Sequence, residues 1–337
     1  MSKNVRFATV VGLLCLCLVV FAGSSFAKSP LVGGADKEVY YMVTFLSGAD
    51  FWKGCFLGMQ EAAEQYGVKV IYAGTPEYDI TQEVTVFEQI VAQKPTGIAL
   101  TAMNPEPFIK PIQKAIEQGI KVVTFDTDAP GSLRATFVST DNFDMGKVLA
   151  RELAKVMNKK GKIGVMTRPA QLNVWTRFLG FKEELEKNYP DMKIAQVTES
   201  QGSEAKAAEA AAALIQANPD LDAIFTTSAI EGIGIATAVK ESGKKIRILA
   251  CDSDVALLDM IKNGEVWATG VQNTYLMGYW SMIALYTLSH NLCDPMSAWK
   301  IDPAVSPLPP FINTGVSLAT KDNTQTFYLR EFKPKNY

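Results

Sequence analysis

Short apolar or β-branched runs alternate with amphipathic segments along most of this chain. The first run, Val39–Phe45, precedes a segment of helical period from about Phe51 to Tyr66, and the same succession recurs as far as Tyr275–Leu288. Strands separated by helices are typical of βαβ units, which build parallel sheets with helices on both faces. The pattern therefore predicts an α/β protein.

The spacing of apolar residues in each run distinguishes the expected strands from the expected helices. The predicted strands are Val39–Phe45, Val68–Ala73, Gly97–Thr101, Val122–Asp126, Lys162–Thr167, Ile194–Thr198, Ala223–Thr227, Ile246–Asp252 and Trp267–Gln272. The predicted helices are Phe51–Tyr66, Ile80–Gln93, Pro107–Glu117, Met145–Met157, Trp175–Asn188, Ser203–Ala217, Ile233–Glu241, Ala256–Asn263 and Tyr275–Leu288.

The chain is long enough for two lobes. Its 337 residues exceed what one hydrophobic core usually organises, and the repeated pattern has a break near Thr140. The tail after Asn291 is rich in proline instead and predicts an extended arm packed over the lobes.

The N-terminus has the pattern of a secretory signal peptide. Lys3 and Arg6 precede the apolar run Ala8–Ala22, and Ser25-Phe26-Ala27 offers small residues at a cleavage site. The apolar run is shorter than the roughly twenty residues of a membrane span, although an uncleaved anchor is the alternative. We expect residues 1–27 to be removed and the mature protein to lie in the periplasm.

Charge and cysteine content exclude several classes of protein. Without Lys3 and Arg6, the 33 basic residues become 31 against 35 acidic ones, which argues against a nucleic-acid partner. Cys55, Cys251 and Cys293 lack metal or redox spacing, although one disulfide is possible.

No constellation for catalysis stands out either. His290 is the only histidine, and its place late on an apolar helix predicts a surface residue at the helix end. Gly232-Ile-Gly234 begins like a dinucleotide fingerprint but has Thr237 at the third glycine position. We expect a protein that is not an enzyme and that holds no metal and no cofactor.

Candidate chemistry lies where the predicted strands end, because ligands of open parallel sheets bind beyond the carboxyl ends of the strands. Polar residues there include Asp126, Asp252 and Gln272, and Arg177 stands at the start of a predicted helix. Phe51-Trp52 follows the first strand. Carboxylates and guanidinium groups bind sugar hydroxyls, and aromatic rings cover the apolar face of a sugar ring.

Each of these residues also has a structural interpretation. A strand-end aspartate is a common helix cap, an arginine at a helix start is often solvated, and the Phe51-Trp52 pair could belong to the core. The residue types together favour recognition of a neutral, hydroxylated ring.

Several motifs in order resemble the periplasmic sugar-binding proteins of ABC importers, of the ribose- and galactose-binding type. The similarity runs from about Glu38 to Asn323. The matching stretches are Phe51-Trp52 with Gly58, Ile120–Asp126, Thr140–Gly146, Arg177–Phe181, Cys251–Gly264 and Ala268–Gln272 followed by Gly278.

The resemblance implies a type I periplasmic binding protein with two Rossmann-like lobes, whose parallel sheets are joined by a three-segment hinge. It places residues 28–140 and 273–312 in an N-terminal lobe, and residues 141–272 and 313–337 in a C-terminal lobe. The three crossings are expected near Thr140, Gln272 and Ile312.

The resemblance also implies a site and partners. Asp126, Arg177, Asp252 and Gln272 would hold hydroxyls, Phe51 and Trp52 would flank the ring, and Asn173 would contact the ligand. The expected partners of this monomer are a sugar or polyol and the membrane subunits of an ABC permease. A sensing role beside a chemoreceptor or histidine kinase is the alternative.

Three positions depart from the family pattern and leave the identity of the sugar open. Thr127 stands in place of an arginine, Ser228-Ala229 replaces an Asn-Asp pair, and Cys251 replaces an aromatic residue.

Overall fold

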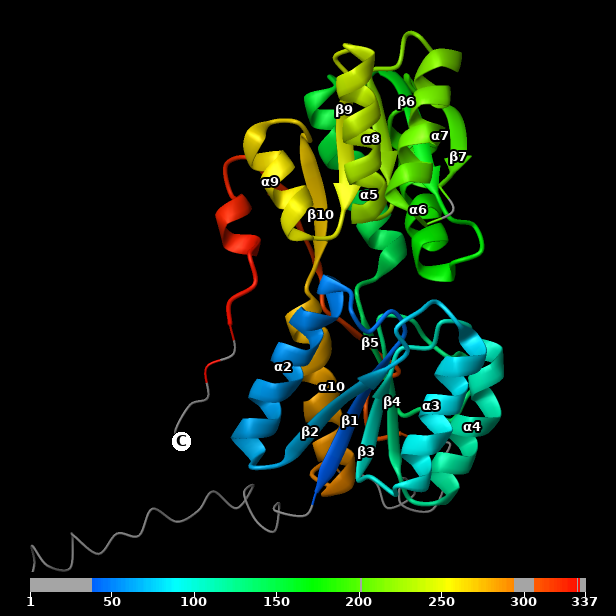
Figure 1. The fold of residues 1–337 in the computed structure, drawn as a ribbon, viewed down its shortest axis with the longest axis vertical. Helices are drawn as coiled ribbons and strands as arrows, with labels where there is room; N and C mark the ends of the chain where they lie inside the picture. Colours follow the sequence, from blue (N-terminus) through cyan, green and yellow to red (C-terminus); the bar gives the residue numbers. More distant parts are fainter. Residues whose placement is uncertain (1–37, 201, 294–305, 332, 334–337) are drawn as a thin grey trace, which may run out of the picture.

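The computed structural model describes residues 38–200, 202–293, 306–331 and 333. The expected signal peptide, residues 1–27, lies outside this part of the chain. Two α/β lobes stand one above the other in Figure 1, each built on its own six-stranded sheet. The predicted fold class, two lobes with largely parallel sheets, is confirmed.

The N-terminal lobe, the lower one in Figure 1, has the strand order β11-β5-β4-β3-β1-β2. All its strand pairs are parallel. Its strands are β1 (Val39–Thr44), β2 (Lys69–Gly74), β3 (Gly97–Leu100), β4 (Lys121–Phe125), β5 (Phe137–Ser139) and β11 (Phe311–Asn313). Its helices are α2 (Asp50–Tyr66), α3 (Ile80–Ala92), α4 (Pro105–Glu117) and α10 (Thr274–Ser289).

Both faces of this sheet are covered by helices. Met59 of α2 and Leu285 of α10 pack with Met42 in one apolar cluster, and Phe87 of α3 packs with Ile98 in another. The alternate buried side chains of the strands therefore supply two core layers.

The C-terminal lobe repeats the plan with the order β12-β10-β9-β8-β6-β7. Its strands are β6 (Gly161–Thr167), β7 (Met192–Glu199), β8 (Ala223–Thr226), β9 (Arg247–Cys251), β10 (Ala268–Gln272) and β12 (Val316–Thr320), of which β12 is antiparallel to β10. Its helices are α5 (Asn142–Val156), α6 (Leu172–Asn188), α7 (Glu204–Ala217), α8 (Ala229–Ser242) and α9 (Val255–Asn263). A 3₁₀ helix, η3 (Thr324–Phe327), follows β12.

One helix pair in each lobe is held close by glycine. A Cβ on Gly278 of α10 would lie 1.7 Å from the Cys55 carbonyl oxygen of α2, and one on Gly180 of α6 would lie 1.9 Å from the Phe143 carbonyl oxygen of α5. These backbones approach more closely than any side chain allows.

The chain passes between the two sheets at three places in the described residues. It leaves β5 at Ser139 for α5 and leaves β10 at Gln272 for α10; it then runs from β11, which ends at Asn313, to β12. Each lobe is therefore assembled from stretches that are distant in sequence.

The sequence pattern missed three short strands. β5 and β11 have only three residues each, and β11 and β12 lie in the proline-rich tail that was predicted to be an extended arm. Pairing with a preformed sheet edge, rather than local periodicity, makes these segments strands. Within the described residues, no helix is long and apolar enough to cross a membrane.

Candidate ligand-binding site

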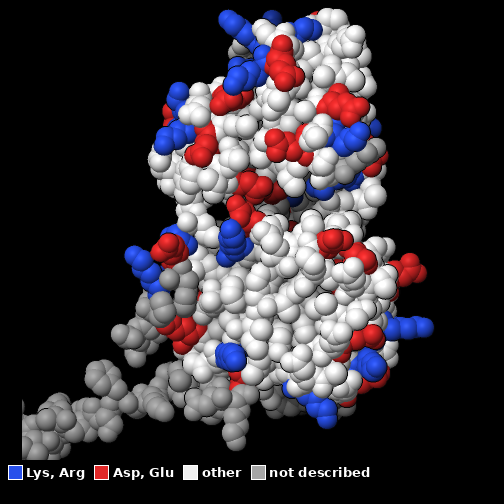
Figure 2. Space-filling model, viewed as in Figure 1, with Lys and Arg blue, Asp and Glu red and all other residues white. Residues whose placement is uncertain are grey.

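The carboxyl ends of the two sheets meet at the boundary between the lobes. Asp126 follows β4 in the N-terminal lobe and Asp252 follows β9 in the C-terminal lobe, and the charge of Asp252 acts on Asp126 across the boundary. Figure 2 shows acidic side chains, with basic ones beside them, on this face where the two lobes meet. The lobes therefore present carboxylates to one another.

Both aspartates adopt a left-handed backbone conformation, with φ of 57° at Asp126 and 71° at Asp252. A hydroxyl of the neighbouring strand holds each carbonyl oxygen: Ser139 Oγ donates to Asp126 at 3.0 Å, and Thr269 Oγ1 donates to Asp252 at 2.7 Å. Aspartate tolerates this conformation better than most residues, so the turn aims a carboxylate beyond the strand end.

Asp126 is almost completely buried, with 4% of its surface exposed. The pKa of Asp126 is raised to about 7, because burial and the nearby Asp252 together outweigh the opposing effect of Arg177. Burial also raises the pKa of Asp254 to about 6, with contributions from Asp252 and from Asp50 of the opposite lobe. Carboxyl groups of both lobes are therefore crowded at the boundary, and two of them ionise only at higher pH than usual.

Arg177 lies on α6 with only 1% of its surface exposed. Its Nη2 and Nε donate to Asn142 Oδ1 at 2.8 and 3.1 Å, and Nη1 donates to the Thr227 carbonyl oxygen. Asn142 in turn donates to the Thr140 carbonyl oxygen at 3.3 Å, beside the first crossing. The guanidinium is thus fixed in orientation, and its electrostatic effect reaches Asp126.

Gln272 ends β10 and joins this group directly. Its Nε2 donates to Asp252 Oδ1 at 2.9 Å, whereas its buried Oε1 has no hydrogen-bond partner among the described residues. Ser228 Oγ, which follows β8, is also buried and has no hydrogen-bond partner among the described residues. Buried polar atoms without partners are rare in folded proteins, so these atoms suit a ligand's hydroxyl groups.

The aromatic pair divides between core and surface. Trp52 is 3% exposed and packs edge-on against Phe45, Phe51 and Phe125, with ring centroids 5.3, 4.9 and 6.0 Å away. Its Nε1 is buried and has no hydrogen-bond partner in the described chain. Trp52 therefore belongs to the core of the lobe and still keeps one polar atom available, while Phe51 is half-buried at the start of α2.

Asn173 is not joined to this cluster by any hydrogen bond among the described residues. Its Oδ1 accepts from the Val174 backbone N–H at 2.9 Å at the start of α6. Its amide nitrogen is the part left for a ligand, because the oxygen is used by the helix.

The positions that depart from the family pattern are small or buried. Thr127 Oγ1 lies 2.6 Å from Thr101 Oγ1, so two hydroxyls occupy the place of a long arginine. Cys251 lies at the end of β9 with no exposed surface, and burial raises the pKa of its thiol to about 12.

Sequence reasoning missed one support of the site and the partner of one strand-end residue, Arg168. Asn142, which orients Arg177, lies in a motif that was noted for its crossover only. Arg168, after β6, lies with Nε 3.3 Å from Oε1 of the buried Glu231, which accepts hydrogen bonds from Ser200 and Thr226. Asn142 contacts Arg177 from 35 residues away, and Glu231 is 63 residues from Arg168; local patterns do not reveal such pairs.

Other reactive groups lie apart from the cluster. His290 ends α10, where its Nε2 is 3.1 Å from Glu38 Oε1 and its ring stacks on Tyr286. Cys55, Cys251 and Cys293 are free thiols. The described residues contain no cluster of side chains suited to a metal ion.

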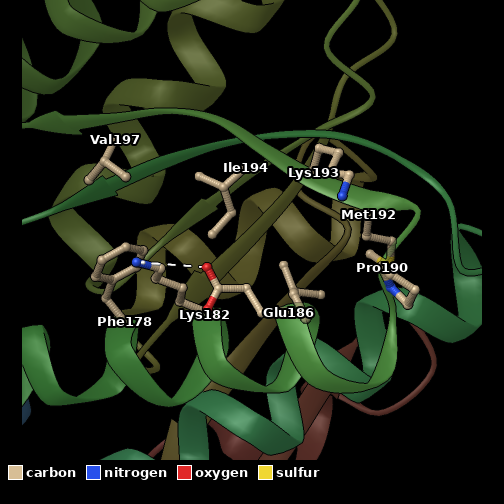
Figure 3. A pocket seen from close by; sticks show the side chains of 9 residues that line it. Phe178, Lys182, Glu186, Pro190, Met192, Lys193, Ile194 and Val197 are labelled. Atoms are coloured by element: carbon tan, nitrogen blue, oxygen red, sulfur yellow. Dashed lines mark ion pairs between the residues drawn. The ribbon is translucent and has the colours of Figure 1, made fainter.

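A hollow of about 400 Å³ opens on the C-terminal lobe between α6 and β7 (Figure 3). Phe178, Met192 and Ile194 line it, and the Lys182–Glu186 ion pair, 3.8 Å long, closes one side. None of the strand-end residues described above lines this hollow. The candidate site is therefore the boundary between the lobes.

Two similar α/β lobes, with carboxylates at the strand ends of both and a fixed guanidinium beside them, define a two-lobed solute-binding protein. The periplasmic binding protein domain family matches residues 39–291, and the chain belongs to this family. The resemblance seen in the sequence is confirmed. Proteins of this family serve binding and transport rather than catalysis.

Sequence and structure comparisons agree on this family. The D-allose-binding periplasmic protein of Escherichia coli (strain K12) is 27% identical over 81% of this chain and 87% of its own length. The solved structure of a sugar-binding protein of a sugar ABC transporter from Bacillus halodurans has 37% identity and a TM-score of 0.83, covering 86% of this chain and all of that one. AraP, an arabinose-binding protein from Geobacillus stearothermophilus, has 41% identity and a TM-score of 0.80, covering 87% and 99%.

Proposed function

We propose that this protein is an extracytoplasmic receptor that binds a monosaccharide or polyol between its lobes and delivers it to an ABC permease. The facing pair Asp126 and Asp252, with Arg177 fixed beside them, is the observation that carries the proposal. Charged groups of both signs make short, directional hydrogen bonds to hydroxyls.

Each side chain has a distinct part. Asp126 and Asp252 accept hydrogen bonds from hydroxyls, one from each lobe, and Arg177 donates to a ring or hydroxyl oxygen. Gln272 Oε1 and Trp52 Nε1, which have no partner among the described residues, supply an acceptor and a donor. Phe51 covers a face of the ring, and the Asn173 amide donates at the edge of the site.

We propose a pentose as the ligand, with arabinose as the first sugar to test. AraP, with 41% identity, is named as an arabinose-binding protein. The Thr101–Thr127 pair supports a ligand that differs from those of relatives with an arginine at this position, because two short hydroxyl side chains leave more room and no charge.

The two lobes, residues 28–140 with 273–312 and residues 141–272 with 313–337, close around the ligand by bending at the three crossings. Hinge closure of this kind hides the bound solute from water and changes the surface that a partner meets. The outer surface of the closed form then docks on the permease.

The N-terminal signal peptide delivers the protein to the periplasm, where it acts as a monomer. The sensing alternative uses the same closure but a receptor in place of the permease. Sugar uptake by cells that lack this protein separates the two roles, since only the transport role predicts loss of uptake. Normal uptake together with a lost transcriptional or chemotactic response would contradict the transport role.

Ligand binding is tested by isothermal titration calorimetry and thermal shift with arabinose, ribose, xylose, galactose and glucose. At a thousandfold excess over Kd, a ligand stabilises the folded state by about 4 kcal/mol, which gives a clear rise in Tm. Absence of heat and of any Tm change with every sugar and with a set of polyols would overturn the proposal. Incubation of the protein with sugar and NAD should leave both unchanged, since turnover would indicate an enzyme.

Replacing Asp252 by Asn tests the assignment of the site. The amide keeps the shape and tolerates the left-handed backbone, but it removes the charged acceptor, so affinity should fall about 10- to 100-fold. Asp220→Asn, at an exposed position paired with Lys162, is the control and should leave affinity unchanged. Equal affinity of Asp252→Asn and wild type would remove Asp252 from the site.

A further inference from the structure

The end of the described chain is attached first to the C-terminal lobe. After β12, the short helix η3 packs on α9, and Phe327 and Tyr328 lie against the apolar cluster of that lobe. Tyr328 Oη donates a hydrogen bond of 2.6 Å to Oδ1 of Asp259, which lies on α9. Tyr328 is thus an anchor on the C-terminal lobe.

The same segment is attached to the N-terminal lobe only two residues later. Arg330 makes a two-pronged ion pair with Glu61 of α2, with Nη1 2.7 Å from Oε1 and Nη2 2.7 Å from Oε2. Tyr275 of α10 donates to the same carboxylate at 2.8 Å, and the Arg330 guanidinium lies 5.9 Å from the centre of the Tyr275 ring. The Glu61 side chain is only 3% exposed, so this anchor is partly shielded from water.

We call residues 328–330 the C-terminal strap. It runs down the outside of the molecule from beside α9 to beside α2, on the left in Figure 1. Two residues of extended chain span at most about 7 Å between Cα atoms, so the backbone between the two anchors is short. Separation of the lobes along this side is limited by the reach of the strap and of its two anchoring side chains, as long as both anchors hold.

The anchor on the N-terminal lobe lies beside a crossing between the lobes. Tyr275 is three residues beyond Gln272, where the chain leaves the C-terminal sheet, and a Cβ on Gly58 of α2 would lie 1.9 Å from the Tyr275 carbonyl oxygen. The first turn of α10 is therefore clamped against α2 at the level where Arg330 binds. Rotation of the lobes at this crossing would change the distance between Glu61 and Asp259.

We propose that the C-terminal strap is a fourth, non-covalently latched link between the lobes, which restricts opening and thereby increases affinity for the ligand. The effect on affinity rests on the proposed function, but the effect on lobe opening does not. A restraint that removes widely open conformations raises the fraction of molecules competent to bind, and apparent affinity rises in proportion to that fraction.

Arg330→Ala releases the anchor on the N-terminal lobe, and Tyr328→Phe weakens the anchor on the C-terminal lobe by removing its hydrogen bond to Asp259. Lobe separation is measured without ligand by double electron–electron resonance between spin labels on Lys114→Cys of α4 and Lys240→Cys of α8, both exposed. In this background Cys293 is replaced by Ser, while Cys55 and Cys251 are buried. The protein without residues 1–27 is used throughout, so that Cys15 and Cys17 are absent.

Arg151→Ala is the matched control. Arg151 also makes a two-pronged contact with a largely buried carboxylate, Glu184, and it is similarly exposed, but both partners belong to the C-terminal lobe. Its loss should change stability without changing the distance between the lobes.

Either anchor variant should broaden the distance distribution and extend it to longer values, while Arg151→Ala matches the wild type. Affinity for the sugar should weaken roughly fivefold or more in the anchor variants. Wild-type distance distributions in both anchor variants would overturn the proposal even if sugar binding is established. Altered distances in a protein that binds no sugar would support the strap and contradict the proposed function instead.

Discussion

At the scale of single residues, Asp126 and Asp252 hold the same unusual backbone conformation at equivalent strand ends of the two lobes. A hydroxyl from the neighbouring strand fixes each of their carbonyl oxygens. Such local strain is maintained only when the surrounding structure enforces it, and it is common at binding sites. The fold itself therefore sets the direction of these two carboxylates.

Asp126→Asn should make the protein more stable at alkaline pH. The folded state raises the pKa of Asp126 from 3.8 to about 7, so it binds a proton more tightly than the unfolded chain does. The free energy of unfolding therefore falls as pH rises from about 4 to about 7, by about 2–4 kcal/mol, and stays lower above that range. Asparagine cannot ionise, so the free energy of unfolding of the Asp126→Asn variant does not fall in this way as pH rises.

Denaturant titrations of both proteins at pH 4 and pH 8 measure this effect. Asp126→Asn should exceed the wild type in stability at pH 8 and approach it at pH 4, and its affinity for sugar should fall. A stability difference that is the same at both pH values would contradict a raised pKa at Asp126.

At the scale of elements, the close pairing of α2 with α10 and of α5 with α6 depends on glycine. Gly278→Ala would place a methyl group 1.7 Å from the Cys55 carbonyl oxygen, so the helices must separate. Overpacking of this kind costs about 1–3 kcal/mol, which should appear as a lower Tm in calorimetry. Gly48→Ala is the control, because nothing lies within 4 Å of its added carbon. Equal Tm values for the two variants would contradict the tight contact.

Most of the helices and the central strands could be predicted from periodicity, because each buries a regular stripe of apolar residues. β5 and β11 could not, since three residues carry no period and their strand state depends on a sheet edge formed elsewhere. The strand-end aspartates were predictable from the topology of parallel sheets. The fixation of Arg177 by Asn142 was not, because only the fold brings these two residues together.

At the scale of the whole molecule, the lobes carry like charges toward one another. Asp126 faces Asp252, and Asp254 of the C-terminal lobe is affected by Asp50 of the N-terminal lobe. Arg177 compensates only part of this charge. When no ligand is bound, the distance between the lobes should therefore depend on pH.

Without sugar, the lobes should be farther apart at pH 8 than at pH 5. The pKa of Asp126 is raised to about 7 and that of Asp254 to about 6, so both are neutral at pH 5 and charged at pH 8. Repulsion across the boundary is then added as pH rises. Small-angle X-ray scattering should give a larger radius of gyration at pH 8.

The double variant Asp126→Asn with Asp254→Asn should abolish this dependence on pH. If the radius of gyration of the double variant still increases with pH, the separation of the lobes is caused by other titrating groups.

The interleaving of the two lobes has a consequence for the order of folding. The N-terminal lobe needs α10 and β11, so its core and the edge of its sheet are incomplete until residue 313 has been synthesised. A growing chain can thus form local helices early but cannot finish its first lobe before nearly all residues are available, and long-range closure of this kind slows folding. Such a protein acquires its native structure largely after synthesis, when residues far apart in sequence can meet in one lobe.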